Sequence, residues 1–193
     1  MNNTEHTLLC ILGRTASGKD SLVSLLCKKK CYKQLISYTT RSKRYEDEGT
    51  HIFVTEEDYN RMQADGQVAA FTQIGRFMYW CTIDQLYESD VYIIDYEGLK
   101  TLRNLNLPNL RLVSVFVNVP DDIRESRALN KRKDDRATFR ARNLAERGQF
   151  REMTKELDFD YMIPNIDISK ACSVLNWIAT AEGLWKNRGL VTE

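Results

Sequence analysis

The loop GRTASGK, from Gly13 to Lys19, constrains the fold of this chain more than any other feature of its sequence. It follows an apolar run at residues 8–12 and precedes a helical pattern in which Leu22, Leu25 and Leu26 share one face. Glycines at both ends of such a loop let backbone N–H groups wrap a phosphate, and the lysine reaches the terminal phosphates of a nucleotide. The sequence therefore predicts a phosphate-binding loop between a buried strand and the amino terminus of a helix.

Short apolar runs recur along the chain and alternate with helical patterns. They lie at residues 91–94, 112–117 and 161–163, with a weaker run at 35–36. Runs that are apolar throughout indicate strands buried on both faces of a parallel sheet. Together with the loop they predict an α/β fold, a doubly wound parallel sheet of the P-loop NTPase type.

Two further helices are predicted from end signals and spacing. Thr55-Glu56-Glu57-Asp58 resembles a capping box, and Gly66 marks the end of the helix that it starts. Near the carboxyl terminus an apolar stripe recurs at helical spacing, and we expect it to face the core, aromatic side chains included. The stripe comprises Val174, Trp177, Ile178, Ala181 and Trp185.

Two stretches interrupt the alternation of strands and helices. Residues 38–81 hold short strand-like pieces, such as 51–54, and predict an inserted α+β subdomain. Residues 127–142 carry seven basic side chains and almost no core signal. We therefore expect one domain with its core at 1–37, 82–126 and 143–193, an inserted subdomain at 38–81, and a short basic stretch at 127–142.

Charge and composition narrow the class of partner. The chain has 28 basic and 27 acidic residues, a formal net charge of +1, so we do not expect nucleic acid as a partner. No apolar stretch reaches the roughly 18 residues that a membrane span needs. The five cysteines are scattered and lack a CxxC pair, which is typical of free thiols in a reducing cytoplasm. We expect small-molecule nucleotides as partners and a monomer or homodimer.

The residue after the loop lysine departs from the usual motif. Asp20, followed by Ser21, replaces the hydroxyl residue that normally ligates Mg²⁺. A carboxylate is still a hard oxygen ligand, so Asp20 is the candidate metal ligand, directly or through water.

Four later segments, in order, resemble those of the guanylate kinase family. They are SYTTRSKR at 37–44, GTHIFVT at 49–55, IIDYEG at 93–98 and FDYMIPN at 159–165. The resemblance covers nearly the whole chain. It implies ATP-dependent phosphoryl transfer, with Mg²⁺, to a nucleoside monophosphate (NMP), GMP or dGMP by default. It also implies that residues 38–81 are an NMP-binding subdomain and that the basic residues 127–142 are a short lid.

The loop and the resemblance together assign candidate site residues. ATP would be bound by Gly13, Arg14, Thr15, Ala16, Ser17, Gly18, Lys19, Asp20, Ser21 and Asn165. The acceptor nucleotide would be bound by Ser37, Arg41, Arg44, His51, Ala70, Tyr79, Cys81 and Asp95. The transferring phosphoryl group would be met by Lys19, Arg41, Arg127, Lys131 and Arg142.

The base site departs most from the family. Ala70 stands where the family has a guanine-binding Glu, and Cys81 where it has a Ser or Thr. Asp95 is the remaining acidic residue that would hydrogen-bond the base. We expect the wall of the base site to be formed by Ala70, Phe71, Trp80 and Cys81. Two alternatives stay open: the same reaction on another or a modified nucleotide, and a non-catalytic guanylate-kinase-like binding module.

Overall fold

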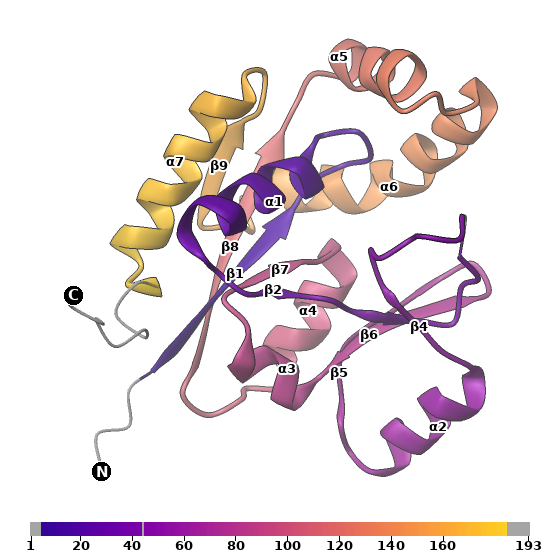
Figure 1. Ribbon diagram of the computed structural model, residues 1–193, viewed down its shortest axis with the longest axis vertical. Coiled ribbons are helices and arrows are strands. Elements are labelled where there is room, and N and C mark those ends of the chain that lie inside the picture. Colours follow the sequence, from indigo (N-terminus) through magenta and orange to yellow (C-terminus); the bar gives the residue numbers. More distant parts are fainter. Residues whose placement is uncertain (1–4, 44, 185–193) are drawn as a thin grey trace.

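The computed structural model describes residues 5–43 and 45–184 and has a five-stranded parallel sheet at its centre (Figure 1). The sheet order is β2-β7-β1-β8-β9, with every pairing parallel. The strands are β1 (His6–Leu12), β2 (Gln34–Leu35), β7 (Val91–Ile93), β8 (Leu110–Asn118) and β9 (Tyr161–Pro164). The predicted α/β fold with a parallel sheet is confirmed.

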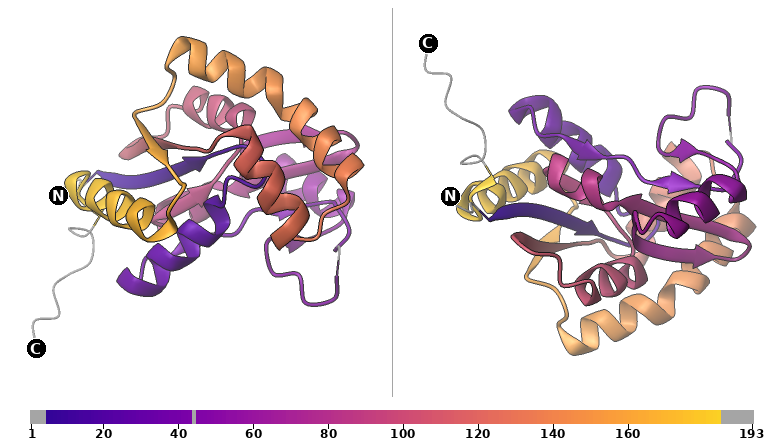
Figure 2. Two further views of the ribbon diagram at one scale, coloured as in Figure 1. Left: turned by 90° about the horizontal axis from the view of Figure 1, so that it is seen from above. Right: turned by 90° about the horizontal axis from the view of Figure 1, so that it is seen from below.

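Helices cover both faces of this sheet (Figure 2). Leu9 and Ile11 of β1 pack into a cluster with α1 (Lys19–Lys30) and α7 (Ile168–Ala181). Leu8, Cys10 and Leu12 point to the opposite face, which α3 (Ile83–Glu88), α4 (Tyr96–Asn104) and α6 (Arg136–Glu156) cover. Because successive side chains of a strand alternate between faces, the continuous apolar run of β1 fills two cores at once.

A second sheet interrupts the first between β2 and α3. It has the order β4-β3-β6-β5 and consists of β3 (Tyr38–Thr39), β4 (Ile52–Phe53), β5 (Val68–Ile74) and β6 (Phe77–Thr82). The helix α2 (Glu56–Ala64) follows β4. Its first turn is closed by a reciprocal capping box between Thr55 and Asp58, and Gly66 lies beyond its end at φ +67°. A four-stranded sheet with one helix is the α+β arrangement expected for the insertion.

The basic stretch at 127–142 has no strand. It continues from α5 (Asp121–Ser126) as the π-helical turn η1 (Arg127–Lys131), then a short connection, and then the first turns of α6. Figure 1 shows α5 and the start of α6 at the end of the sheet where β1 leads into α1. The proposed lid therefore stands over the phosphate loop.

The prediction for the carboxyl-terminal helix is right in its helical form and wrong in its face. Trp177 is 65% exposed and Val174 45% exposed, and Ala181 is exposed as well. The buried face of α7 is instead formed by Ala171, Cys172, Leu175, Ile178 and Ala179. The predicted stripe contains one of these residues, Ile178, because it was drawn along the neighbouring row of side chains. Trp185 lies outside the described residues.

Across 5–43 and 45–184, no helix has the length and apolarity needed to cross a membrane. The same residues contain no cluster of three or more metal-ligating side chains. All five cysteines lie in these described residues, and none of them forms a disulfide.

Candidate nucleotide-binding site

The carboxyl ends of the central strands bring the candidate site together. β1 leads into the phosphate loop, β2 into Ser37, β7 into Asp95 and β9 into Asn165. Ligands of open α/β sheets bind at this edge, where neighbouring connections leave in opposite directions. Segments more than 100 residues apart in the chain thus meet because of the parallel strand order.

The phosphate loop has the geometry that its glycines predict. Ala16 and Gly18 have φ of +60° and +80°, so the chain turns tightly before α1 begins at Lys19. A Cβ on Gly13 would lie 2.6 Å from Ser17 Oγ and 3.0 Å from the carbonyl oxygen of Val117. Asn165 closes the loop from β9, because its Nδ2 donates to the carbonyl oxygen of Ser17 at 2.8 Å. Successive N–H groups of such a turn form a concave anion site.

The outer arm of the loop is tied to α5 and α6. Arg14 donates to Asp121 at 2.9 Å and to Asn143 at 2.7 Å, and the N–H of Thr15 donates to Glu146 Oε2 at 2.6 Å. Burial, and the neighbouring Arg124 charge, lower the pKa of Arg14. These contacts hold the loop against the helices that carry the basic stretch.

Arg124 is a buried cation that sequence reasoning missed. Its Nη1 donates to the carbonyl oxygen of Thr15 at 3.0 Å, and its Nη2 donates to Asp121 and Asn143. The side chain is fully buried, which is rare for an arginine. Its spacing of three residues after Asp121 was the available signal, since that spacing places the two on one helix face.

A cavity of about 420 Å³ lies between the loop, the second sheet and α6. Predicted donor residues and predicted acceptor residues line it together: Gly13, Thr15, Lys19, Asp20, Ser37, His51, Ala70, Tyr79, Asp95 and Arg142. An adjoining hollow of about 250 Å³ shares Asp20, Ser37 and His51 with it. The volume falls in the range of small-molecule sites.

The residues predicted to bind the acceptor phosphate lie at the ends of the short strands β3 and β4, and Tyr79 lies on β6. Ser37 Oγ and His51 Nδ1 are 2.9 Å apart, and the His51 ring contacts that of Tyr79. Arg41 is buried and pairs with Glu48, whose carboxylate raises the pKa of the guanidinium. Glu48 was not predicted, because an acid seven residues after Arg41 gives no sign of its burial. Arg44 lies outside the described residues.

The opposite end of the cavity holds Asp95, at the amino terminus of α4. Its Oδ1 accepts the N–H of Gly98 at 2.9 Å and the hydroxyl of Thr72 at 3.0 Å. Burial raises the pKa of this carboxyl, and the two hydrogen bonds oppose that shift. Ala70, beside it, has φ +51° at a β-bulge between Ala69 and Thr72. Asp95 therefore presents a partly desolvated carboxylate to the cavity.

The expected wall of the base site needs correction. Of its four members, Ala70 lines the cavity. Phe71 and Trp80 instead pack against Tyr59 of α2, with ring centroids 5.4 Å and 4.9 Å away. Cys81 is fully buried behind the cavity, where burial raises its thiol pKa to about 12. Alternation along β6 turns Trp80 away from the cavity that Tyr79 lines, whereas Cys81, on the same face as Tyr79, lies in the core cluster.

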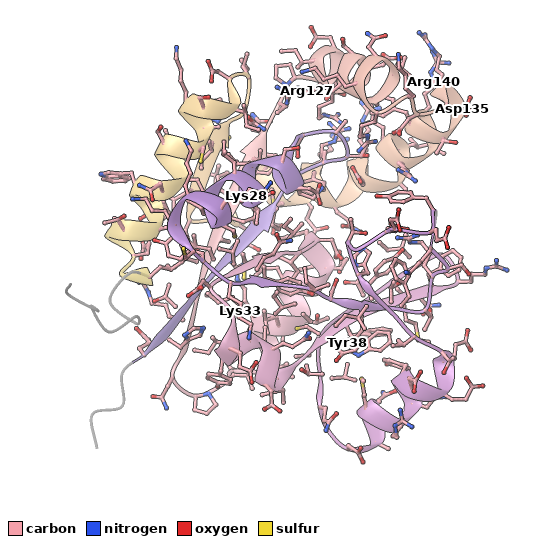
Figure 3. All side chains as sticks on the ribbon, viewed as in Figure 1. Lys28, Lys33, Tyr38, Arg127, Asp135 and Arg140 are labelled. Atoms are coloured by element: carbon pink, nitrogen blue, oxygen red, sulfur yellow. The ribbon has the colours of Figure 1, made fainter. Side chains whose placement is uncertain are left out.

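The basic stretch contributes unequally to the cavity. Arg142 lines it, as does Arg132, whereas Lys131 is exposed and outside the lining. Arg127 donates to the carbonyl oxygen of Asn165 at 2.7 Å and that of Ser17 at 3.3 Å. Figure 3 shows Arg127 near the start of α1, while Arg140 lies at the outer edge of α6. Arg132 was missed because it neighbours Lys131, the position that the family pattern indicated.

Asp20 and Ser21 follow Lys19 in the first turn of α1 and are both exposed. The Asp20 carboxylate faces the same cavity as Lys19. One hard oxygen ligand beside a phosphate site fits Mg²⁺, which commonly takes one or two carboxylates together with nucleotide phosphates. The residues present thus fit the metal.

The fold and this site define a P-loop nucleotide-binding protein of the nucleoside monophosphate kinase class. A family model described as guanylate kinase matches residues 5–182, so the chain belongs to the guanylate kinase family. It is 30% identical to a guanylate kinase of Wolbachia pipientis over 193 residues, which cover 95% of this chain and 94% of that protein. It is 29% identical to one of Vibrio parahaemolyticus over 191 residues, covering 92% and 89%.

A solved structure agrees on the fold. The guanylate kinase from Anaplasma phagocytophilum superposes with a TM-score of 0.63 at 20% identity, covering 93% of this chain and 87% of that one. Because both chains are covered almost completely, the insertion and the basic stretch are included in the likeness.

Proposed function

We propose that this chain is a guanylate kinase, which transfers the γ-phosphoryl group of ATP to the phosphate of GMP or dGMP. The observation that carries the proposal is the shared cavity. Lys19 and the phosphate loop line it from the first sheet, and Ser37, His51 and Tyr79 line it from the side of the second. Donor and acceptor phosphates bound at these two places would face each other, as in-line transfer needs.

On the donor side, the loop amides and Lys19 hold the terminal phosphates of ATP. Asp20 is the candidate ligand of Mg²⁺, which supplies charge neutralisation at the phosphates when bound. Ser21, also in the first turn of α1, and Asn165 complete the donor site. Asn165 bonds the carbonyl oxygen of Ser17, so it preserves the loop conformation.

On the acceptor side, Ser37, Arg41, His51 and Tyr79 bind the phosphate, and Arg44 is predicted to join them. Positive charge aimed at the equatorial oxygens of the transferring group lowers the barrier. Arg142 and Arg132 already line the cavity, and Arg127 and Lys131 reach it when the lid closes. Cysteines that form no disulfide fit a reducing cytoplasm.

The test is ADP release from ATP with Mg²⁺ over a panel of ribo- and deoxynucleoside monophosphates. We expect GMP and dGMP to be the best acceptors and Lys19→Ala to abolish turnover. A preference for another base would change the acceptor and keep the reaction. No turnover of any nucleotide by folded protein would contradict the proposal and favour a binding module.

Calorimetry with ATP distinguishes a kinase from a non-catalytic binding module. ATP binding that Lys19→Ala abolishes is expected of a kinase, because the lysine reaches the terminal phosphates. A retired module has no need of an intact donor site, so absence of ATP binding by the wild-type chain would indicate such a module.

A further inference from the structure

Thr72 lies next to the candidate base-reading residue and belongs to none of the motifs that identify the family. Its hydroxyl donates to Asp95 Oδ1 at 3.0 Å, across 23 residues of sequence. The side chain is buried, 5% exposed, on β5. The N–H of Gly98 donates to the same oxygen at 2.9 Å. Both bonds end on Oδ1 of Asp95, a residue that lines the cavity.

The backbone places the Thr72 hydroxyl where it has little freedom. The bulge at Ala70, with φ +51°, shifts the register of β5 between Ala69 and Thr72. A Cβ on Gly98 would come within 3.1 Å of Thr72 Oγ1, so the helix α4 approaches this strand closely. A hydroxyl has one proton, and here it is donated to Asp95. The hydrogen bond thereby fixes the orientation of the Asp95 carboxylate.

The surroundings of Asp95 make its orientation matter. Ala70, Ile94 and Phe150 line the cavity beside it and belong to one apolar cluster. Ala70 has no polar side-chain atom, so a base at this end meets the Asp95 carboxylate among apolar neighbours. Burial raises the pKa of Asp95, whereas the hydrogen bond from Thr72 lowers it. The Thr72 bond therefore favours the ionised carboxylate, the form that accepts hydrogen bonds.

We infer that Thr72 is a positioning residue for recognition of the acceptor base. It fixes Asp95 so that Oδ2 accepts from N–H donors on the base edge, such as the ring N–H and amino group of guanine. This role rests on the proposed function, because it concerns the acceptor of that reaction. In this chain the base would therefore be recognised by Asp95, held by Thr72, in place of the acid that the family has at the position of Ala70.

The experiment compares Thr72→Val with Thr101→Val, a matched control. Thr101 Oγ1 also lies at the α4–β5 contact, 3.1 Å from the carbonyl oxygen of Phe71 and 2.9 Å from that of Gly98, and both of these acceptors are backbone carbonyl groups, not Asp95. For Thr72→Val we expect the KM for GMP to rise about tenfold or more, with kcat and the KM for ATP within about twofold, since one hydrogen bond to a charged group is lost. Thr72→Ser is expected to restore most of the KM, and Thr101→Val to leave it within about twofold.

The pH profile gives a second readout. Removing the Thr72 hydroxyl removes a donor that lowers the Asp95 pKa, so the acid limb of kcat/KM for GMP should move to higher pH in Thr72→Val. Glu97 of α4 also raises the pKa of this carboxyl, and the Asp95 charge in turn raises the pKa of Tyr92 of β7; both residues are unchanged in both variants. Thr101→Val should keep the wild-type limb.

Outcomes distinguish the inference from the function on which it rests. Equal KM values for GMP in Thr72→Val and Thr101→Val, with wild-type turnover intact, would overturn the inference alone. If the wild type turned over no nucleotide, the proposed function would fail. Calorimetry of GMP binding would then decide the inference, which requires at least about tenfold weaker binding in Thr72→Val than in Thr101→Val.

Discussion

The carboxylate of Glu48 holds both Nη atoms of Arg41, at 2.7 Å and 3.1 Å, with the two residues 3% and 9% exposed. Thr50 donates to the same carboxylate at 3.0 Å. A forked, charge-assisted pair of this kind fixes the plane of the guanidinium. The arginine proposed to clamp the acceptor phosphate is thus oriented before any nucleotide arrives.

Glu48→Gln should therefore affect both stability and acceptor binding. The change leaves the buried Arg41 charge uncompensated, and we expect a loss of about 3 kcal/mol of unfolding free energy together with a higher KM for GMP. Urea denaturation and steady-state kinetics measure the two effects. Glu88→Gln is the control, because Glu88 pairs with Lys33 at an exposed site and should change neither. An unaltered stability of Glu48→Gln would contradict the role of the pair.

Gly18→Ala should abolish ATP binding. Gly18 has φ +80°, and an added Cβ would lie 2.8 Å from Asn165 Nδ2, so the loop and its bond to Asn165 must both shift. Calorimetry with ATP measures the loss. Gly66→Ala is matched in backbone conformation, at φ +67°, with open space around the new Cβ, and costs about 1 kcal/mol of stability without loss of ATP binding. Equal ATP affinities in the two variants would contradict this.

Asp95→Asn should lower activity without lowering stability at pH 7, and its effect on stability should depend on pH. Burial raises the folded-state pKa of Asp95 above its ordinary value of 3.8, so the folded protein binds more protons than the unfolded one between the two values. The contribution of Asp95 to stability is thus greatest below pH 3.8 and falls as pH rises through the folded pKa.

Asparagine removes that penalty and still caps α4. At pH 7 we expect Asp95→Asn to be at least as stable as wild type in thermal melts, with an advantage that shrinks as pH falls through this window. Its kcat/KM for GMP should fall about tenfold or more, because the base loses a charged acceptor. A strongly lowered Tm at pH 7 would show that the charge stabilises the fold instead.

Leu175→Ala should lower the free energy of unfolding more than Trp177→Ala, although tryptophan is the larger side chain. Leu175 is fully buried against α1 and the sheet, and its truncation should cost about 3 kcal/mol. Trp177 is 65% exposed, so its truncation should cost less than about 1 kcal/mol. Urea denaturation of both variants measures the difference. Comparable losses would restore the expectation that the tryptophan lies in the core.

Features that depend on neighbours in the chain were predictable from sequence. The phosphate loop is a local object: its glycines, its lysine and its strand-to-helix context lie within about 20 residues. The capping box of Thr55 and Asp58 closes within one helical turn. The parallel sheet was predicted from continuous apolar runs, because a strand that is buried on both faces has apolar residues at successive positions instead of alternating apolar and polar ones.

Only the tertiary structure decided which side chains meet. The face that α7 buries depends on the helix and sheet against it, so Trp177 lies outside although its spacing is helical. The bulge at Ala70 sends Phe71 towards Tyr59 and Thr72 towards Asp95, and no local pattern encodes that. Contacts such as Arg41 with Glu48 and Glu146 with Thr15 satisfy charges and backbone groups that become buried when the elements pack. The sequence by itself determined the phosphate loop and its fold, whereas packing determined the residues around the acceptor.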